Sequence, residues 1–154
     1  MQLAHYLGLL HRSQSELAEA FRAIRRGHPR EPDLSGVCER LAAQCHDQAY
    51  RLEPFLRRYA VDAAAEQPER LHVPLFSGAR SGGLGLLRDL HDLYLLATEC
   101  EVSWTLIGQA ARGARDEELI DLVRHCGQET AVHLLWLRTR MRQAAPQVLA
   151  VPSG

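Results

Sequence analysis

The chain has 154 residues, of which 46% are hydrophobic and 24% are charged. That length is enough for one globular domain that buries its core without disulfide bonds or a structural metal. The 18 Lys and Arg residues against 19 Asp and Glu give a formal charge of -1, which argues against a nucleic-acid-binding protein that relies on phosphate contacts. No apolar run reaches the roughly 18 residues of a membrane span, so no membrane-spanning helix is expected.

The N-terminus and the cysteines bear on the cellular compartment. The first residues lack a basic stretch and a small-residue cleavage site, so we expect no secretory signal. Four cysteines without close pairing fit thiols in a reducing environment better than a disulfide framework. The sequence therefore predicts a cytoplasmic protein, in which buried free thiols serve as small apolar core residues. These cysteines are Cys38, Cys45, Cys100 and Cys126.

Two segments in the first half place apolar residues at the 3.6-residue period of an α-helix. The first runs from about residue 3 to residue 26 and ends at Gly27, with Pro29 just beyond, as helices commonly do. The second begins near Pro32. Pro54 lies inside it and is expected to bend or break this helix, because proline removes a backbone donor and clashes with the preceding turn.

Two more helical segments follow in the second half, and nothing in the chain has the pattern of a β-hairpin. One begins after residues 81–83 (Ser-Gly-Gly). The other begins near Asp116, where Glu117 and Glu118 in the first turn suit the positive end of the helix dipole. The sequence thus predicts an all-α protein with four long helices.

The connections between the helices differ in length, and this difference predicts the topology. Short connections join the first helix to the second and the third to the fourth, which implies two antiparallel hairpins. About twenty residues, 61–80, join the hairpins and are long enough to cross the bundle. We therefore expect a single four-helix bundle over 1–145 with a long crossover, and a C-terminal tail over 146–154. Apolar residues that could dock the crossover and the tail are Leu71, Val73, Leu75, Phe76, Val148 and Leu149.

Three stretches of the second half are similar to the bacterioferritin and rubrerythrin type of the ferritin-like superfamily. They are residues 101–104 (Glu-Val-Ser-Trp), residues 110–112 (Ala-Ala-Arg) before a short acidic turn, and residues 133–137 (His-Leu-Leu-Trp-Leu). The resemblance covers the C-terminal third in sequence and nearly the whole chain in architecture. It implies a ferritin-like four-helix bundle, the superfamily whose core holds two iron or two manganese ions.

The resemblance also implies six metal ligands, namely one Glu from each of two helices and a Glu-x-x-His pair from each of the other two. Residues three apart share a helix face, so both members of a pair reach the same two ions. We compared this pattern with the polar residues on the inward stripes, at about 100° per residue. In helix order those residues are Gln14, then Cys45 and Gln48, then Glu101, then Thr130 and His133.

Only Glu101 and His133 match the expected ligands. One carboxylate and one imidazole cannot neutralise and ligate two hard cations, so we expect a degenerate metal site and no cofactor. Gln14, Gln48, Glu101 and His133 would then form a buried polar layer, because buried polar groups need hydrogen-bond partners. A single metal ion at Glu101 and His133, or an ordered water, is an alternative occupant of this layer.

Two functions remain open. The leading interpretation is a non-catalytic ferritin-like bundle that acts as a homodimer or with a partner protein. Leu95, Val102 and Leu106 form a second apolar stripe on the third helix, and a contiguous exposed apolar patch usually marks an interface.

The alternative function is a di-iron or di-manganese carboxylate redox protein, such as a ferroxidase or an oxygen-activating enzyme. A different helix register would then recruit three further ligands beside Glu101 and His133. These ligands would be Glu16, His46 and Glu129.

Overall fold

The computed structural model describes residues 2–60 and 75–152. Within these ranges the chain forms four long helices and no strand, so the predicted all-α class is confirmed. A π-helical turn over Pro146–Ala150 directly continues the last helix. Residues 61–74, which include Leu71 and Val73, lie outside the described part. The helices are α1 (Leu3–Gly27), α2 (Pro32–Tyr59), α3 (Gly82–Gly113) and α4 (Glu117–Ala145).

The helix ends follow local signals in the sequence. α1 ends at Gly27, and the next backbone N–H, from His28, still donates to Ile24. α2 starts with Pro32 in its first turn, where the missing N–H costs nothing because no helical partner exists for it. Asp116 caps α4, since its carboxylate accepts from the backbone N–H of Leu119 at 3.1 Å. Each of these ends agrees with the sequence prediction.

Pro54 does not break α2, contrary to one expected outcome, because the helix continues through it to Tyr59. Pro54 and Tyr50 both lie on the exposed face of α2. The carbonyl of Tyr50, which loses its helical donor at Pro54, therefore points to a side of the helix that water reaches. Solvent can replace the missing hydrogen bond at that position.

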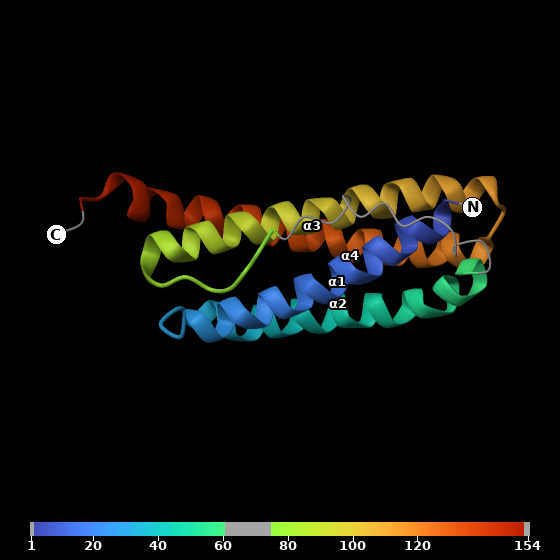
Figure 1. The fold of residues 1–154 in the computed structure, drawn as a ribbon. Helices are drawn as coiled ribbons and strands as arrows, with labels where there is room; N and C mark the ends of the chain where they lie inside the picture. The colour runs from blue at the N-terminus through green and yellow to red at the C-terminus, as the bar shows by residue number, and fades with distance from the viewer. Residues whose placement is uncertain (1, 61–74, 153–154) are drawn as a thin grey trace.

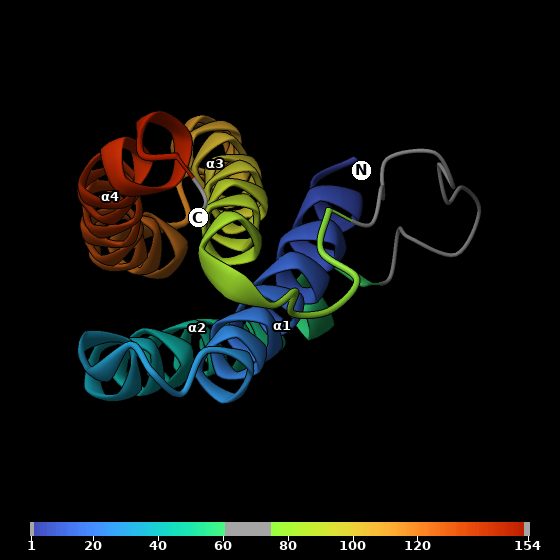
Figure 2. The ribbon, with the colours of Figure 1, turned by 90° about the vertical axis from the view of Figure 1, so that its left-hand side faces the viewer.

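The four helices lie side by side as two antiparallel pairs, α1 with α2 and α3 with α4 (Figures 1 and 2). Contacts at the two ends define their directions. Arg58 near the end of α2 binds Asp116 at the α3–α4 turn, and His28 after α1 contacts Asp89 near the start of α3. α2 and α3 therefore run in the same direction, and α2 ends at the opposite end of the bundle from the start of α3.

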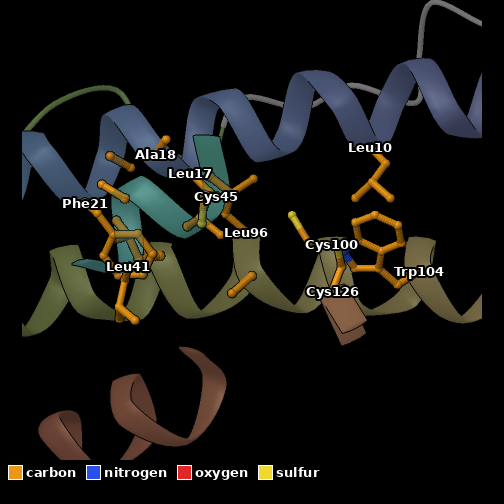
Figure 3. Close-up of a cluster of buried hydrophobic side chains, with 14 of the residues drawn as sticks. Leu10, Leu17, Ala18, Phe21, Leu41, Cys45, Leu96, Cys100, Trp104 and Cys126 are labelled. Carbon is orange, nitrogen blue, oxygen red and sulfur yellow. The ribbon is translucent and has the colours of Figure 1, made fainter. Parts of the chain in front are cut away.

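An apolar core runs along the bundle and receives side chains from all four helices. Figure 3 shows part of it, with Leu10 of α1 against the ring of Trp104 and Leu17 near Cys45 and Leu96. All four cysteines are free and fully buried, as the sequence predicted. Burial raises the pKa of Cys126 to about 12, so this thiol keeps its proton at neutral pH. Among the helices described, none is long and apolar enough to cross a membrane.

Long polar side chains bridge α2 and the preceding turn to α4 and its cap. Ion pairs stand at both ends of this α2–α4 seam, and two glutamine contacts lie between them. The two glutamine contacts join α2 to His133 and Glu129 of α4, so this seam contains part of the site described next. In order along the bundle its pairs are Asp33–Arg140, Gln44–His133, Gln48–Glu129 and Arg58–Asp116.

Candidate functional site

Three of the four residues predicted for the polar layer are fully buried, namely Gln14, Gln48 and His133. The fourth, Glu101, is exposed, so the expectation that it faces inward is wrong. The inward positions at this level of α3 are Cys100 and Trp104. Glu101 follows Cys100 by one residue and is therefore rotated by about 100° from it, which keeps its charge in water.

His133 is the best-defined member of the layer. Its Nε2 lies 2.8 Å from Oε1 of Gln44, and its Nδ1 lies 3.8 Å from Sγ of Cys45. An amide oxygen only accepts hydrogen bonds, so Nε2 carries the proton and the thiol of Cys45 donates to Nδ1. The ring also meets the edge of Phe21, with 6.0 Å between ring centroids. Burial lowers the pKa of His133 to about 4, so the imidazole is neutral at neutral pH.

Gln48 connects the layer to the surface. Its Nε2 donates to Oε1 of Glu129 at 3.0 Å, and His125 lies 3.7 Å from the same oxygen. The side chain of Glu129 keeps 20% of its surface exposed and that of His125 keeps 48%. Glu129 therefore stands at the rim of the layer, where water still solvates its charge, and the centre of the bundle holds amides, thiols and a neutral imidazole.

The ligands required by the di-metal alternative do not come together. His46 and Glu101 are both exposed, whereas Glu16 is half-buried and Glu129 stands at the rim. Over residues 2–60 and 75–152, no group of three or more His, Cys, Asp or Glu side chains is close enough to hold a metal ion. Two hard cations need several converging carboxylates. The residues present therefore do not fit a pair of iron or manganese ions.

A second buried polar cluster, at the start of α3, was missed in the sequence. Asp89 is fully buried and accepts from His28 Nε2 at 2.7 Å and from the backbone N–H of Arg80 at 2.9 Å, both at Oδ2. Arg80 Nη1 binds the other oxygen at 2.7 Å and also contacts Asp92 at 3.0 Å. With its oxygens paired in this way, Asp89 joins α1, the segment before α3, and α3. Its one sequence signal is its place among apolar positions, three residues after Leu86.

The predicted outer stripe of α3 is exposed to solvent. Leu95, Val102 and Leu106 keep 44%, 51% and 46% of their surface accessible. A groove of about 630 Å³ begins at Leu106 and extends between the ends of α3 and α1, where Leu3 and Tyr6 line it. The outer face of α3 therefore offers apolar side chains that nothing in the described part of the chain covers.

The tail prediction holds for one of its two residues. Val148 is half-buried and lies beside Gly83 at the start of α3, whereas Leu149 is 68% exposed. In the crossover, Leu75 and Phe76 pack against the core as expected.

Comparison of the chain with protein-family models, curated proteins and solved structures finds no match. The ferritin-like resemblance therefore stays a prediction.

Proposed function

We propose that this chain is a non-catalytic, ferritin-like helical bundle that acts through contact with a second copy of itself or with a partner protein. The observation that carries this proposal is the outer stripe of α3, where Leu95, Val102 and Leu106 are each about half exposed. Transfer of such side chains from water into an interface is favourable, at roughly 25 cal/mol per Å² of apolar surface. A row of them on one helix face is a typical association surface.

Two features support the ferritin-like and non-catalytic parts of the proposal. The first is the direction of the helices, because parallel α2 and α3 between two antiparallel hairpins is what one long crossover produces. The second is the composition of the centre, where the resemblance implies three carboxylates and two histidines on α1, α2 and α4. The buried residues there are Gln14, Cys45, Gln48, Thr130 and His133, of which only His133 matches. Neutral side chains at those places favour a structural core over a redox centre.

Analytical ultracentrifugation tests the association surface. We expect the wild-type chain to sediment as a dimer at micromolar concentration, or to co-purify with one partner in constant ratio. The double variant Leu95→Glu, Val102→Glu should be a folded monomer that has lost the partner. Leu149→Glu is the matched control, since Leu149 is equally apolar and 68% exposed but lies off the stripe. A wild-type chain that stays monomeric at high micromolar concentration and recovers no partner would refute the proposal.

Metal analysis tests the remaining di-metal alternative. The protein is purified without chelators or affinity metals, reconstituted anaerobically with Fe(II) or Mn(II), and analysed for metal content per chain. We expect no stoichiometric metal and an unchanged Tm, and we expect Glu101→Gln to have no effect because Glu101 is exposed. Near two ions per chain, lost in Glu101→Gln, would establish the di-iron or di-manganese protein instead.

A further inference from the structure

Four polar atoms in the centre of the bundle have no hydrogen-bond partner among the described protein atoms. They are Oε1 and Nε2 of Gln14, Oε1 of Gln48 and Nε1 of Trp104. Gln14 and Gln48 have no exposed surface, and Trp104 has 2%. Folded proteins seldom leave buried donors and acceptors unpaired, because desolvation without a compensating hydrogen bond is costly. A partner for these atoms is therefore to be expected.

Gln14 and Gln48 stand at the same level of the bundle. The contacts His11–Glu53 at 3.9 Å and Arg25–Glu39 at 3.2 Å fix the antiparallel register of α1 and α2. In this register Gln14 lies opposite residue 50, two residues beyond Gln48. Two residues correspond to about 3 Å along a helix, so the two amides project into the same layer of the core.

Trp104 belongs to this layer as well. The His28–Asp89 contact fixes the register of α1 and α3 and places Gln14 opposite residue 103. Figure 3 shows Leu10, one turn before Gln14, against the indole ring, and the ring nitrogen on the side next to Cys100. The nitrogen therefore faces the part of the core between Leu10 and Leu17, the two inward turns of α1 on either side of Gln14. The unpaired atoms of three helices thus lie at one level of the bundle.

The chemistry of the four atoms defines what can bind them. Gln14 Nε2 and Trp104 Nε1 are donors, whereas Gln14 Oε1 and Gln48 Oε1 are acceptors, so the ligand must both donate and accept. Burial keeps the thiols of Cys45 and Cys100 protonated by raising their pKa, and Glu129 is held at the solvent rim by Gln48. The other carboxylates whose charge acts on Cys100, Glu16 and Glu99, are also only half-buried. No fully buried carboxylate among Glu16, Glu99 and Glu129 is therefore available to neutralise an ion at the centre of the layer, and a small neutral molecule fits.

We propose that this layer is an internal hydration site, in which one or more long-lived water molecules bind between Gln14, Gln48 and Trp104. Water is the smallest neutral molecule that donates and accepts at once, and a buried water typically makes about three hydrogen bonds. The site would connect α1, α2 and α3 through solvent at the level where the resemblance implies metal. This inference goes beyond the proposed function and holds whether or not the chain forms a dimer.

A crystal structure of the full chain, at a resolution where ordered water is visible, is the direct test. We expect ordered water within about 2.7–3.2 Å of a Gln14 amide atom, of Gln48 Oε1 and of Trp104 Nε1. The proposal fails if the four atoms bond to one another or to other side chains with no water between them. It also fails if the layer contains density for an ion.

Solution NMR gives an independent readout on the wild-type chain. We expect a magnetisation-transfer cross-peak of the sign of long-lived water between the indole N–H of Trp104 and the solvent resonance. Trp136, which is partly exposed, is the internal control for rapidly exchanging surface water. Absence of the Trp104 cross-peak in a well-folded sample would overturn the proposal.

Substitution of Gln14 separates a hydrated layer from a dry one. In a hydrated layer, Gln14→Leu expels the water and leaves Gln48 Oε1 and Trp104 Nε1 unpaired, so Tm falls by several degrees and the Trp104 cross-peak disappears. In a dry layer the same change removes two unpaired atoms and raises Tm. Leu17→Met, one turn along the same stripe, is the matched control with a small effect on Tm. Loss of folding in Gln14→Leu would leave the wild-type cross-peak and the crystal structure as decisive tests.

Discussion

His28 and Asp89 join the end of α1 to the first turns of α3 through a contact of 2.7 Å between Nε2 and Oδ2, with both side chains buried. Arg80 completes the arrangement, because its backbone N–H and its guanidinium bind the same carboxylate. At this end of the bundle, the carboxylate of Asp89 in α3 therefore binds both His28, which follows α1, and Arg80, which precedes α3. This shared carboxylate holds the two hairpins together. Such a contact determines the register of α1 against α3, which the apolar stripes alone leave open.

We predict that Asp89→Ala lowers the free energy of unfolding by about 3–5 kcal/mol, since it leaves His28 and Arg80 without their buried partner. Urea denaturation measures this loss. Asp121→Ala is the control, because the Asp121 side chain is 72% exposed and pairs only with the neighbouring Arg124 among the contacts described. Removal of such a surface pair should cost at most about 1 kcal/mol. If the two substitutions lowered the free energy of unfolding equally, Asp89 would stabilise the fold no more than an exposed carboxylate does.

A pair of glycines tests how closely the segment before α3 packs on α1. A Cβ added to Gly27 would lie 2.5 Å from Cβ of Ala79, and neither atom belongs to a side chain that can move aside. Gly27→Ala should therefore destabilise the protein by about 1–3 kcal/mol. Gly36→Ala within α2 should instead stabilise it by about 0.5–1 kcal/mol, because nothing lies within 4 Å and alanine favours a helix. A neutral Gly27→Ala would mean that Ala79 is not held against α1.

The helix limits and the buried cysteines could be predicted because their signals are local. Gly27, Pro32 and Asp116 act within one turn of the chain, and a stripe needs only its own helix to define an inward face. Glu101 shows the limit of that approach, since an error of one residue turns a side chain by about 100°. It is exposed, and the adjacent Cys100 is buried.

The partners within the candidate site could not be predicted from the stripes. His133 pairs with Gln44, and Gln48 pairs with Glu129, across the α2–α4 seam. Each pairing joins residues more than 80 positions apart in the chain and depends on the register of α2 against α4. That register is determined by ion pairs such as Arg58–Asp116, which a single helix cannot reveal.

His133 should make the stability depend on pH. Its pKa is about 4 in the folded chain and 6.5 as a free side chain, with burial as the cause. The unfolded state therefore binds a proton first as the pH falls, and the stability present above pH 6.5 is lost progressively down to about pH 4. The loss attributable to His133 should be about 3 kcal/mol. Urea denaturation between these pH values should show that the free energy of unfolding falls by about 3 kcal/mol less in His133→Gln than in the wild type. An equal fall in the two proteins would show that His133 is not the cause of the pH dependence.

Asp116 should contribute more to stability than any other charge at the α3–α4 turn. Its carboxylate is almost fully buried, caps α4 through Leu119 N–H, and accepts from Tyr59 at 2.5 Å and from Arg58 at 2.7 Å. Desolvation raises the pKa of Asp116, but the hydrogen bonds from Tyr59 and Arg58 outweigh it and leave the pKa below its ordinary value. The stability it provides is therefore present above pH 3.8 and is lost as the pH falls below this value.

Asp116→Ala removes the cap and both inter-helix bonds together, so the expected loss is about 2–4 kcal/mol. Glu118→Ala is the matched control, since Glu118 binds the same Arg58 but its side chain is 78% exposed. That change should cost at most about 1 kcal/mol. Asp116→Asn keeps an oxygen to accept from Leu119 but loses the charge facing Arg58. Its stability should therefore lie between those of Asp116→Ala and Glu118→Ala. If Asp116→Ala were no worse than Glu118→Ala, the end of α2 would be held to α4 by apolar contacts instead of by this carboxylate.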